Sequence, residues 1–140
     1  MRQWHVSPKC LCRQHLLGEH LEHHMFLGSL KKKYSVKGYI DNKCLIPVTL
    51  NCRHDDLVKE MIFRGFNHKT PLDSVENYLD PYMLDIELSY DYLFYSVLSL
   101  VNRCYECFVR FCQYFKIPSH SLITREAICF IARKIYYGSC

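Results

Sequence analysis

Apolar residues recur along most of this chain at the three- and four-residue spacing that is typical of amphipathic helices. This spacing predicts helices over residues 10–27, 53–64, 86–115 and 121–136. Gly28 and Gly65 would end the first two, because glycine readily adopts the left-handed conformation found just beyond a helix. The third segment is either one long helix or two helices with a break near Asn102.

The segments between these helices carry residues that interrupt regular structure. Residues 1–8 are predicted to form an extended arm, because Pro8 disfavours an earlier helix and resembles a helix start signal. A lysine run at 31–33 begins a loop or short helix that extends to Gly38. Together these features predict an all-α protein with a single domain covering residues 1–140.

Composition restricts the compartment and the partners. The net charge of +4 and the pI near 8.5 suit a polyanionic partner without identifying one. The longest apolar run, residues 92–101, is shorter than the roughly 20 residues of a membrane-spanning helix. The chain has nine cysteines, an odd number, and no secretory signal, so an intracellular protein is expected. Cytoplasm, nucleus and virion are not distinguished.

The cysteines of the third helical segment are predicted to be small buried apolar residues. The stretch Cys104-Tyr105-Glu106-Cys107 matches the C-x-x-C pattern of redox proteins. That pattern normally opens a helix after a strand, whereas here it is predicted to lie in the middle of a helix. A redox role is therefore disfavoured.

Histidines and cysteines crowd the first predicted helix, which raises the alternative of a zinc site. His20 and His24 are one turn apart on one face, a spacing that can chelate zinc. No second cysteine pair or distant histidine pair completes a recognised pattern, so zinc stays an alternative. The residues considered for it are Cys10, Cys12, His15, His20, His23 and His24.

The most informative motif is the stretch Arg-Gln-His-Leu-Leu-Gly-Glu-His-Leu-Glu at residues 13–22. It combines a seam of two leucines with polar rows formed by Gln14, His15, Glu19 and Glu22. Following an arginine at position 2, this helix resembles the pyrimidine-dimer DNA glycosylases of the phage endonuclease V type. Residues 56–67 resemble that family's second helix, which ends in Arg-Gly-Phe-Asn.

The C-terminal Tyr136-Tyr137-Gly138 resembles the aromatic tail of the same family. The resemblance is convincing over residues 1–72, looser over residues 73–121, and returns at the tail. It implies an endonuclease V-like helical fold that uses no cofactor and no metal ligand. It also implies that the partner is double-stranded DNA, and a monomer is expected unless the chain is part of an assembly.

The resemblance further implies the catalytic residues. The nucleophile is the α-amine of the chain, which belongs to Met1 because Arg2 is too bulky for ordinary removal of the initiator methionine. The essential carboxylate is Glu22. An α-amine titrates about two to three pH units below a lysine, so it is the more readily deprotonated nucleophile. The implied function is a DNA N-glycosylase with abasic-site lyase activity on damaged pyrimidines, through a Schiff base.

DNA contacts are implied for Arg2, Gln14 and His15, which match family positions and can donate to phosphates. Tyr136 and Tyr137 would provide stacking surfaces for a base. For each residue an ordinary role stays open: local hydrogen bonds at the surface for the polar residues, and packing against the first helix for the tyrosines. Glu22 likewise has the alternative of a solvated helix residue that pairs with a neighbouring base.

Two departures from the family favour a second function class. Leu21 and Met25 replace two arginines that flank the catalytic glutamate in the family, and His23 and His24 would substitute for them in part. Residues 84–115, rich in cysteine and tyrosine, depart most from the family and would offer a face to a protein partner. The alternative is a non-catalytic structural or DNA-binding protein, of viral origin, built on the same fold.

Overall fold

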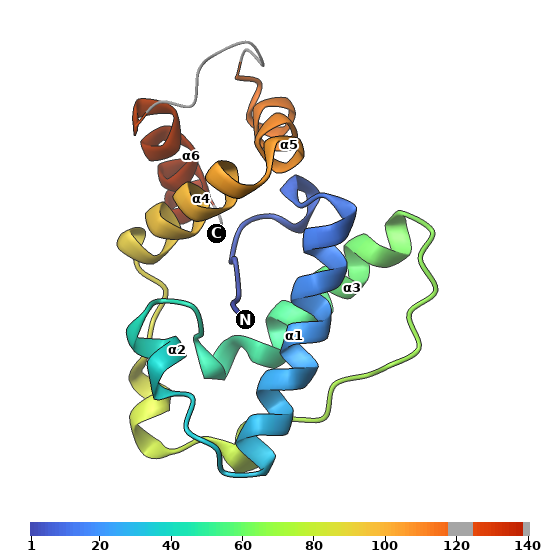
Figure 1. The fold of residues 1–140 in the computed structure, drawn as a ribbon, viewed down its shortest axis with the longest axis vertical. Coiled ribbons are helices and arrows are strands. Elements are labelled where there is room, and N and C mark those ends of the chain that lie inside the picture. The colour runs from blue at the N-terminus through green and yellow to red at the C-terminus, as the bar shows by residue number, and fades with distance from the viewer. Residues whose placement is uncertain (118–124, 139–140) are drawn as a thin grey trace. The chain divides into compact units, whose positions relative to one another are not determined.

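The computed structural model describes residues 1–117 and 125–138, and all regular elements in these ranges are helical. Figure 1 shows the α-helices, which are α1 (Arg13–Lys31), α2 (Lys37–Asp41), α3 (Leu50–Phe63), α4 (Tyr90–Arg103), α5 (Tyr105–Phe115) and α6 (Arg125–Gly138). Four 3-10 turns also occur, at Pro8–Cys10, Pro47–Thr49, Glu76–Tyr78 and Pro81–Asp85. The predicted all-α class is confirmed.

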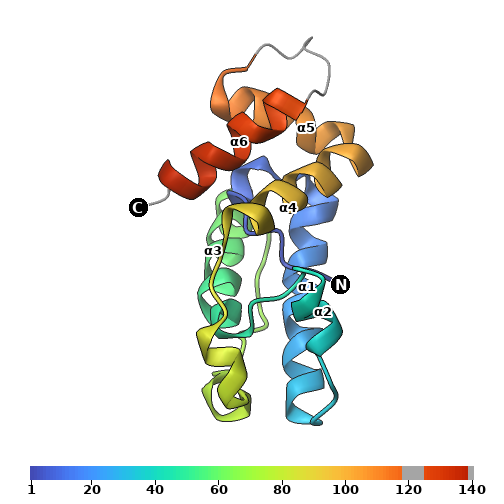
Figure 2. The ribbon, with the colours of Figure 1, turned by 90° about the vertical axis from the view of Figure 1, so that its left-hand side faces the viewer.

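The chain forms two compact units, of which the first holds residues 1–3 and 14–87 and the second holds residues 4–13 and 88 onward. Side-chain hydrogen bonds join α1 to α3 in the first unit, and these helices lie side by side in Figure 2. In the second unit α4 packs against both α5 and α6. The single domain over residues 1–140 stays a prediction.

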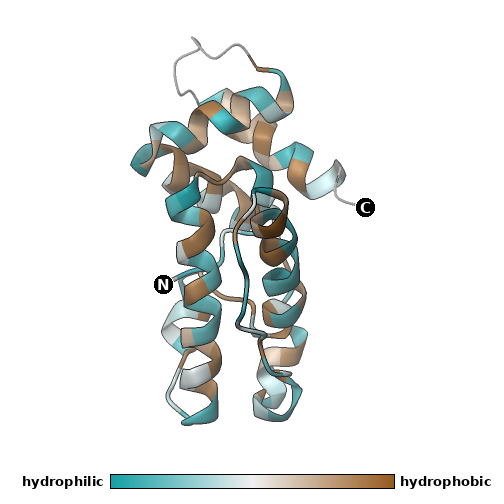
Figure 3. Cartoon of the chain, turned by 90° about the vertical axis from the view of Figure 1, so that its right-hand side faces the viewer, coloured by the Kyte–Doolittle hydropathy of each residue, from teal (hydrophilic) through white to brown (hydrophobic). Residues whose placement is uncertain are grey.

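The core of the first unit lies near the C-terminal end of α1. It consists of buried apolar residues from α1 and from the segments that follow it, namely Phe26, Leu27, Leu30, Val36, Leu45, Leu50, Val75 and Met83. The partly buried side chain of Met1 packs against this cluster, so the first residue of the chain is anchored. Figure 3 shows that apolar residues form bands along the helices, as expected for amphipathic helices in a small protein.

Helix α1 differs from its prediction at both ends. It begins at Arg13 rather than at residue 10, because Pro8–Cys10 forms a separate 3-10 turn. It continues through Gly28, where the prediction ended it, because Leu30 is buried in the core. Burying a leucine contributes about 1.5–3 kcal/mol, which exceeds the cost of about 1 kcal/mol for a glycine inside a helix.

Helix α3 ends as predicted and begins three residues earlier than predicted. Gly65 has a φ of 86° and donates its N–H to the carbonyl of Ile62 at 2.9 Å. Phe66 then donates to the carbonyl of Met61 at 2.9 Å, which closes the helix end. The early start at Leu50 follows from the 3-10 turn that leads directly into the helix.

The segment 86–115 forms two helices, and the break lies at Cys104, close to the predicted position near Asn102. Cys104 has extended backbone, with φ −140° and ψ 104°, and caps the start of α5. The prediction that the C-x-x-C stretch lies in the middle of a helix is therefore wrong. It opens a helix instead.

The last predicted helix is confirmed over Arg125–Gly138, while its expected beginning at residue 121 lies outside the described residues. None of the helices in residues 1–117 or 125–138 has the length and apolar character needed to cross a bilayer.

Candidate active site

The first residues of the chain are fixed by Gln3, whose side chain is completely buried. Its amide oxygen accepts the N–H of Ile46 at 2.8 Å, and its backbone N–H donates to the carbonyl of Cys44 at 2.7 Å. Its amide nitrogen lies 3.2 Å from the hydroxyl of Thr49 and 3.1 Å from Nε2 of His23. A buried amide with this many partners holds one position, so the chain start has a defined place beside α1.

The carboxylate of Glu22 lies at the start of the chain. Its Oε2 accepts the backbone N–H of Arg2 at 2.9 Å. Only three covalent bonds separate that nitrogen from the α-amine of Met1, so the carboxylate lies within roughly 6.5 Å of the amine. The arm and α1 thus join Arg2 to Glu22 across twenty positions of sequence, within the first unit, and bring Met1 close to the same carboxylate.

His23 is a buried neutral imidazole rather than a surface cation. Its Nδ1 lies 2.8 Å from the carbonyl oxygen of Glu19, which can only accept, so this nitrogen is assigned the proton. The bare Nε2 then accepts from the amide of Gln3. Burial lowers the pKa of His23 to about 4. The expectation that His23 would replace a phosphate-binding arginine is therefore wrong.

The same burial predicts an acid-sensitive fold. Unfolded, a histidine titrates near 6.5, whereas folded His23 titrates near 4, so the unfolded chain binds the extra proton between these values. His23 alone should lower the free energy of unfolding by about 3 kcal/mol as the pH falls through this window. Urea denaturation at several pH values would measure the decrease. A His23→Gln variant should show a shallower dependence, and equal slopes would contradict this assignment.

One helical turn before Glu22, a buried ion pair joins α1 to α3. Arg53 contacts Glu19 with two parallel hydrogen bonds, Nε to Oε2 at 2.7 Å and Nη2 to Oε1 at 2.9 Å. Glu19 is 1% exposed and Arg53 6% exposed, so the pair is shielded from water. The sequence interpretation placed Glu19 in a polar row and missed Arg53. The available signal was that Glu19 shares the helical stripe of Leu16, which is buried.

Four histidines gather beside this ion pair. His20 and His24 of α1 have ring centroids 5.0 Å apart, which confirms that they are neighbours on one face. His54 of α3 places its Nε2 3.1 Å from Nε2 of His20, and His68 adds a third close imidazole. Ring nitrogens of His20, His54 and His68 all lie within 4.8 Å of one another. The sequence interpretation did not foresee the two later histidines, which fold back onto α1.

This histidine cluster has the chemistry of a nitrogen-ligand metal site. Burial, and then the neighbouring histidines led by His54, lower the pKa of His20 to about 4. His20 is therefore neutral at physiological pH, and neutral imidazole is the form that binds metals. The Nε2 atoms of His24 and His68 are buried without a hydrogen-bond partner.

The residues expected to contact DNA occupy different places. Gln14 is exposed and His15 partly buried, both in the first turn of α1. Tyr136 and Tyr137, 39% and 71% exposed, lie in the last turn of α6 in the second unit. Their roles stay predictions.

Leu21 and Met25 stand where the family has arginines, and both are exposed, at 60% and 48%. The surface of α1 around Glu22 is therefore more apolar than the resemblance implies.

The part of the sequence that forms this site matches a known protein family. A family model described as pyrimidine dimer DNA glycosylase matches residues 1–74, which is 74 of the 140 residues. The chain belongs to the pyrimidine dimer DNA glycosylase family. No curated protein and no solved structure matches it. The residues matched by the glycosylase family include the arm, Glu22 and the buried network that holds them, and the family's substrate is DNA.

Proposed function

We propose that this member of the glycosylase family is a DNA N-glycosylase with abasic-site lyase activity on damaged pyrimidines in duplex DNA. The observation that carries the proposal is the 2.9 Å hydrogen bond from the N–H of Arg2 to Glu22. An amine and a carboxylate held this close within a fixed network match the needs of Schiff-base chemistry, in which a nucleophile works beside a proton-transfer group.

The proposed reaction has two stages. The unprotonated α-amine of Met1 attacks C1′ of the damaged nucleotide, and the bond from C1′ to the base breaks as the base leaves with its electron pair and gains a proton. The amine nitrogen loses one of its two protons, the bond from C1′ to O4′ breaks as the sugar ring opens and O4′ gains a proton, and a protonated Schiff base results. Loss of a proton from C2′ then expels the 3′ phosphate, and water finally releases the sugar from the amine. Glu22 transfers protons and stabilises the cationic intermediates.

DNA binding is proposed for the residues that the resemblance marks. Arg2, Gln14 and His15 would donate to backbone phosphates, and Tyr136 and Tyr137 would stack against bases. Phosphate contacts position the duplex without reading its sequence. We therefore expect the absence of arginine at positions 21 and 25 to weaken binding at the lesion more than it changes the chemistry.

A second candidate is a non-catalytic DNA-binding or structural protein. The observation that favours it is the exposed pair Leu21 and Met25, where apolar side chains replace the phosphate-binding groups of an active enzyme. In that case the amine and Glu22 would be retained only as parts of the fold.

Borohydride trapping tests the proposal against this alternative. Protein without a tag is incubated with duplex DNA that carries either a thymine dimer or an abasic site, and borohydride reduces any Schiff base to a stable link. We expect a covalent adduct that peptide mapping assigns to the α-amine of Met1. Acetylated protein, or a chain extended by Gly-Ser at its N-terminus, serves as the matched control and should form none.

The two substrates separate the parts of the proposal. Trapping on both duplexes supports glycosylase and lyase together, whereas trapping on the abasic duplex alone retains the lyase and requires another damaged base. If protein with a free N-terminus is trapped on neither duplex, the catalytic proposal fails and the non-catalytic one replaces it.

A further inference from the structure

Three cysteines of the second unit converge where α5 begins. Cys12 ends the segment that precedes α1, while Cys104 caps α5 and Cys107 lies in its first turn. The Sγ atoms of Cys12 and Cys104 are 3.8 Å apart, far beyond the roughly 2.05 Å of a disulfide bond. Two sulfurs bound to one tetrahedral zinc ion at about 2.3 Å would be about 3.8 Å apart. The observed spacing fits two ligands that share an ion.

Backbone amides point at two of these sulfurs. Cys107 donates its N–H to Sγ of Cys104 at 3.4 Å, and Cys12 donates its N–H to Sγ of Cys107 at 3.2 Å. Hydrogen bonds of this kind favour the charged thiolate, which is the form that binds metals. The two sulfurs of the C-x-x-C stretch also lie at the N-terminus of an eleven-residue helix, where the helix dipole favours negative charge.

Two of the three cysteines are shielded from water. The burial of Cys12 and Cys107 suits a closed structural site, from which solvent is excluded.

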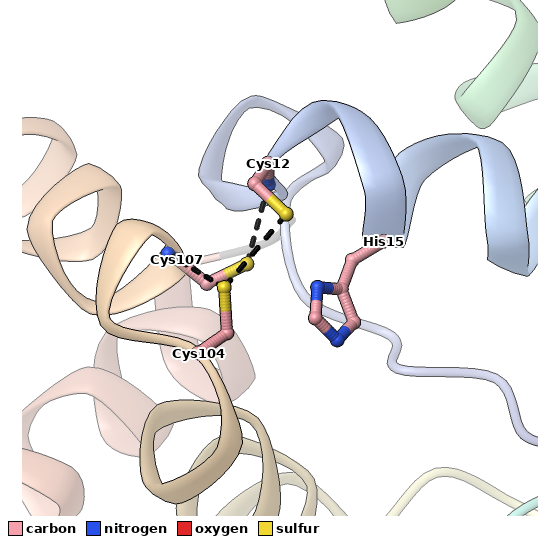
Figure 4. Close-up of side chains that lie close together, drawn as sticks. All are labelled: Cys12, His15, Cys104 and Cys107. Carbon is pink, nitrogen blue, oxygen red and sulfur yellow. Dashed lines mark hydrogen bonds between the residues drawn. The ribbon is translucent and has the colours of Figure 1, made fainter.

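His15 is the candidate for a fourth ligand because of its position along the chain. It follows Cys12 by three residues, so Cys12-x-x-His15 has the same spacing as Cys104-x-x-Cys107. The three cysteine side chains lie together in Figure 4, and His15 follows Cys12 in the first turn of α1. Two such chelating pairs from separate parts of a sequence are typical of structural zinc sites.

We propose that Cys12, His15, Cys104 and Cys107 bind one structural zinc ion. Three thiolates and one imidazole fill the four positions of tetrahedral zinc, so no position is left for water or substrate. Through its cysteine ligands the ion would link residues 4–13 to the junction of α4 and α5. This segment and this junction both belong to the second unit. With His15 bound to zinc, the phosphate contacts proposed above would come from Arg2 and Gln14 alone.

The sequence offers zinc only as an alternative, among cysteines and histidines of the first predicted helix that include Cys12 and His15, with no second pair to complete the site. It also places the C-x-x-C stretch in the middle of a helix. The break at Cys104 opens that helix and turns both sulfurs toward Cys12. The proposal does not depend on the glycosylase activity.

Metal content of the full chain tests this proposal. The protein is expressed with added zinc, and gel filtration removes loosely bound metal. Elemental mass spectrometry is then expected to find one zinc ion per chain. Cys104→Ser and Cys107→Ser should each lower the retained zinc at least about tenfold. Cys112→Ser is the matched control, since Cys112 is also buried on α5 but lies outside the cluster, and it should retain the ion. Equal zinc in wild type and Cys107→Ser would overturn the proposal.

A second measurement keeps the test valid where a serine variant does not fold. Wild-type protein loaded with cobalt(II) should show the strong visible bands of a tetrahedral ion and a near-ultraviolet thiolate-to-cobalt transition, which histidine ligands do not give. His54→Ala should leave these bands unchanged. If the thiolate transition is missing, or if metal binding is lost in His54→Ala and kept in Cys107→Ser, the ion lies at the histidine cluster and the proposal is wrong.

Discussion

Replacing Glu22 with glutamine is expected to abolish borohydride trapping and strand cleavage while leaving the fold intact. The side-chain oxygen of glutamine can still accept the N–H of Arg2, which Glu22 accepts at 2.9 Å, so the arm keeps its place. The change removes the negative charge and the proton acceptor beside the α-amine. Since general acid-base catalysis contributes about 10²–10⁴-fold, we expect the single-turnover rate to fall by at least about 100-fold.

The measurement compares single-turnover cleavage of one damaged duplex by wild type, Glu22→Gln and Glu76→Gln. Glu76 is an exposed glutamate in a 3-10 turn of the same unit, and its variant should retain full activity. Thermal melting of all three proteins checks the fold, and fluorescence anisotropy checks that DNA affinity is largely kept. Rapid cleavage by Glu22→Gln would assign the proton transfer to another residue and refute the role given to Glu22.

The local features of this fold could be predicted from sequence because they depend on neighbouring residues. The closure of α3 at Gly65 follows from a single glycine with positive φ, and the apolar spacing was sufficient to locate α1 and α3. The pairing of Met1 with Glu22 came from resemblance rather than from periodicity. Its physical support, the burial of Gln3, could not be read from the sequence, since a glutamine near a chain end is normally solvated.

The errors come from contacts between distant segments. Glu19 can be buried with its charge because Arg53 reaches it from α3, thirty-four positions later, whereas an unpaired charged residue on a helix is expected to face water. The histidine cluster likewise depends on His54 and His68 returning to α1. At Cys104 the helix breaks without glycine or proline, and the cap that stabilises the break is the cysteine itself. The stripe that Glu19 shares with Leu16 signals its burial, and a break near Cys104 is one of the predicted alternatives, but no local pattern identifies the distant partners of these residues.

Removing one partner of the Glu19–Arg53 pair is expected to destabilise the protein by about 3–5 kcal/mol, because it leaves an uncompensated charge in the interior. Arg53→Met retains much of the apolar bulk of the arginine side chain. It leaves the carboxylate of Glu19, which is 1% exposed, without its charge partner. The double variant Glu19→Met, Arg53→Met removes both charges and should recover most of the loss, since buried ion pairs are often replaceable by apolar side chains. Urea denaturation of the two variants and wild type would measure this difference.

The control for this cycle is the exposed pair of Lys31 and Asp73, whose charged atoms are 2.7 Å apart at the surface of the same unit. Solvent screens such a pair, so Lys31→Met should leave the unfolding midpoint essentially unchanged. If Arg53→Met behaved like Lys31→Met, the interior would tolerate an unpaired carboxylate and the pair would not define the position of α1.

A second outcome concerns activity. If the double variant is stable but cleaves damaged DNA slowly, the main contribution of the Glu19–Arg53 pair is the placement of Glu22, one turn further along α1, rather than stability.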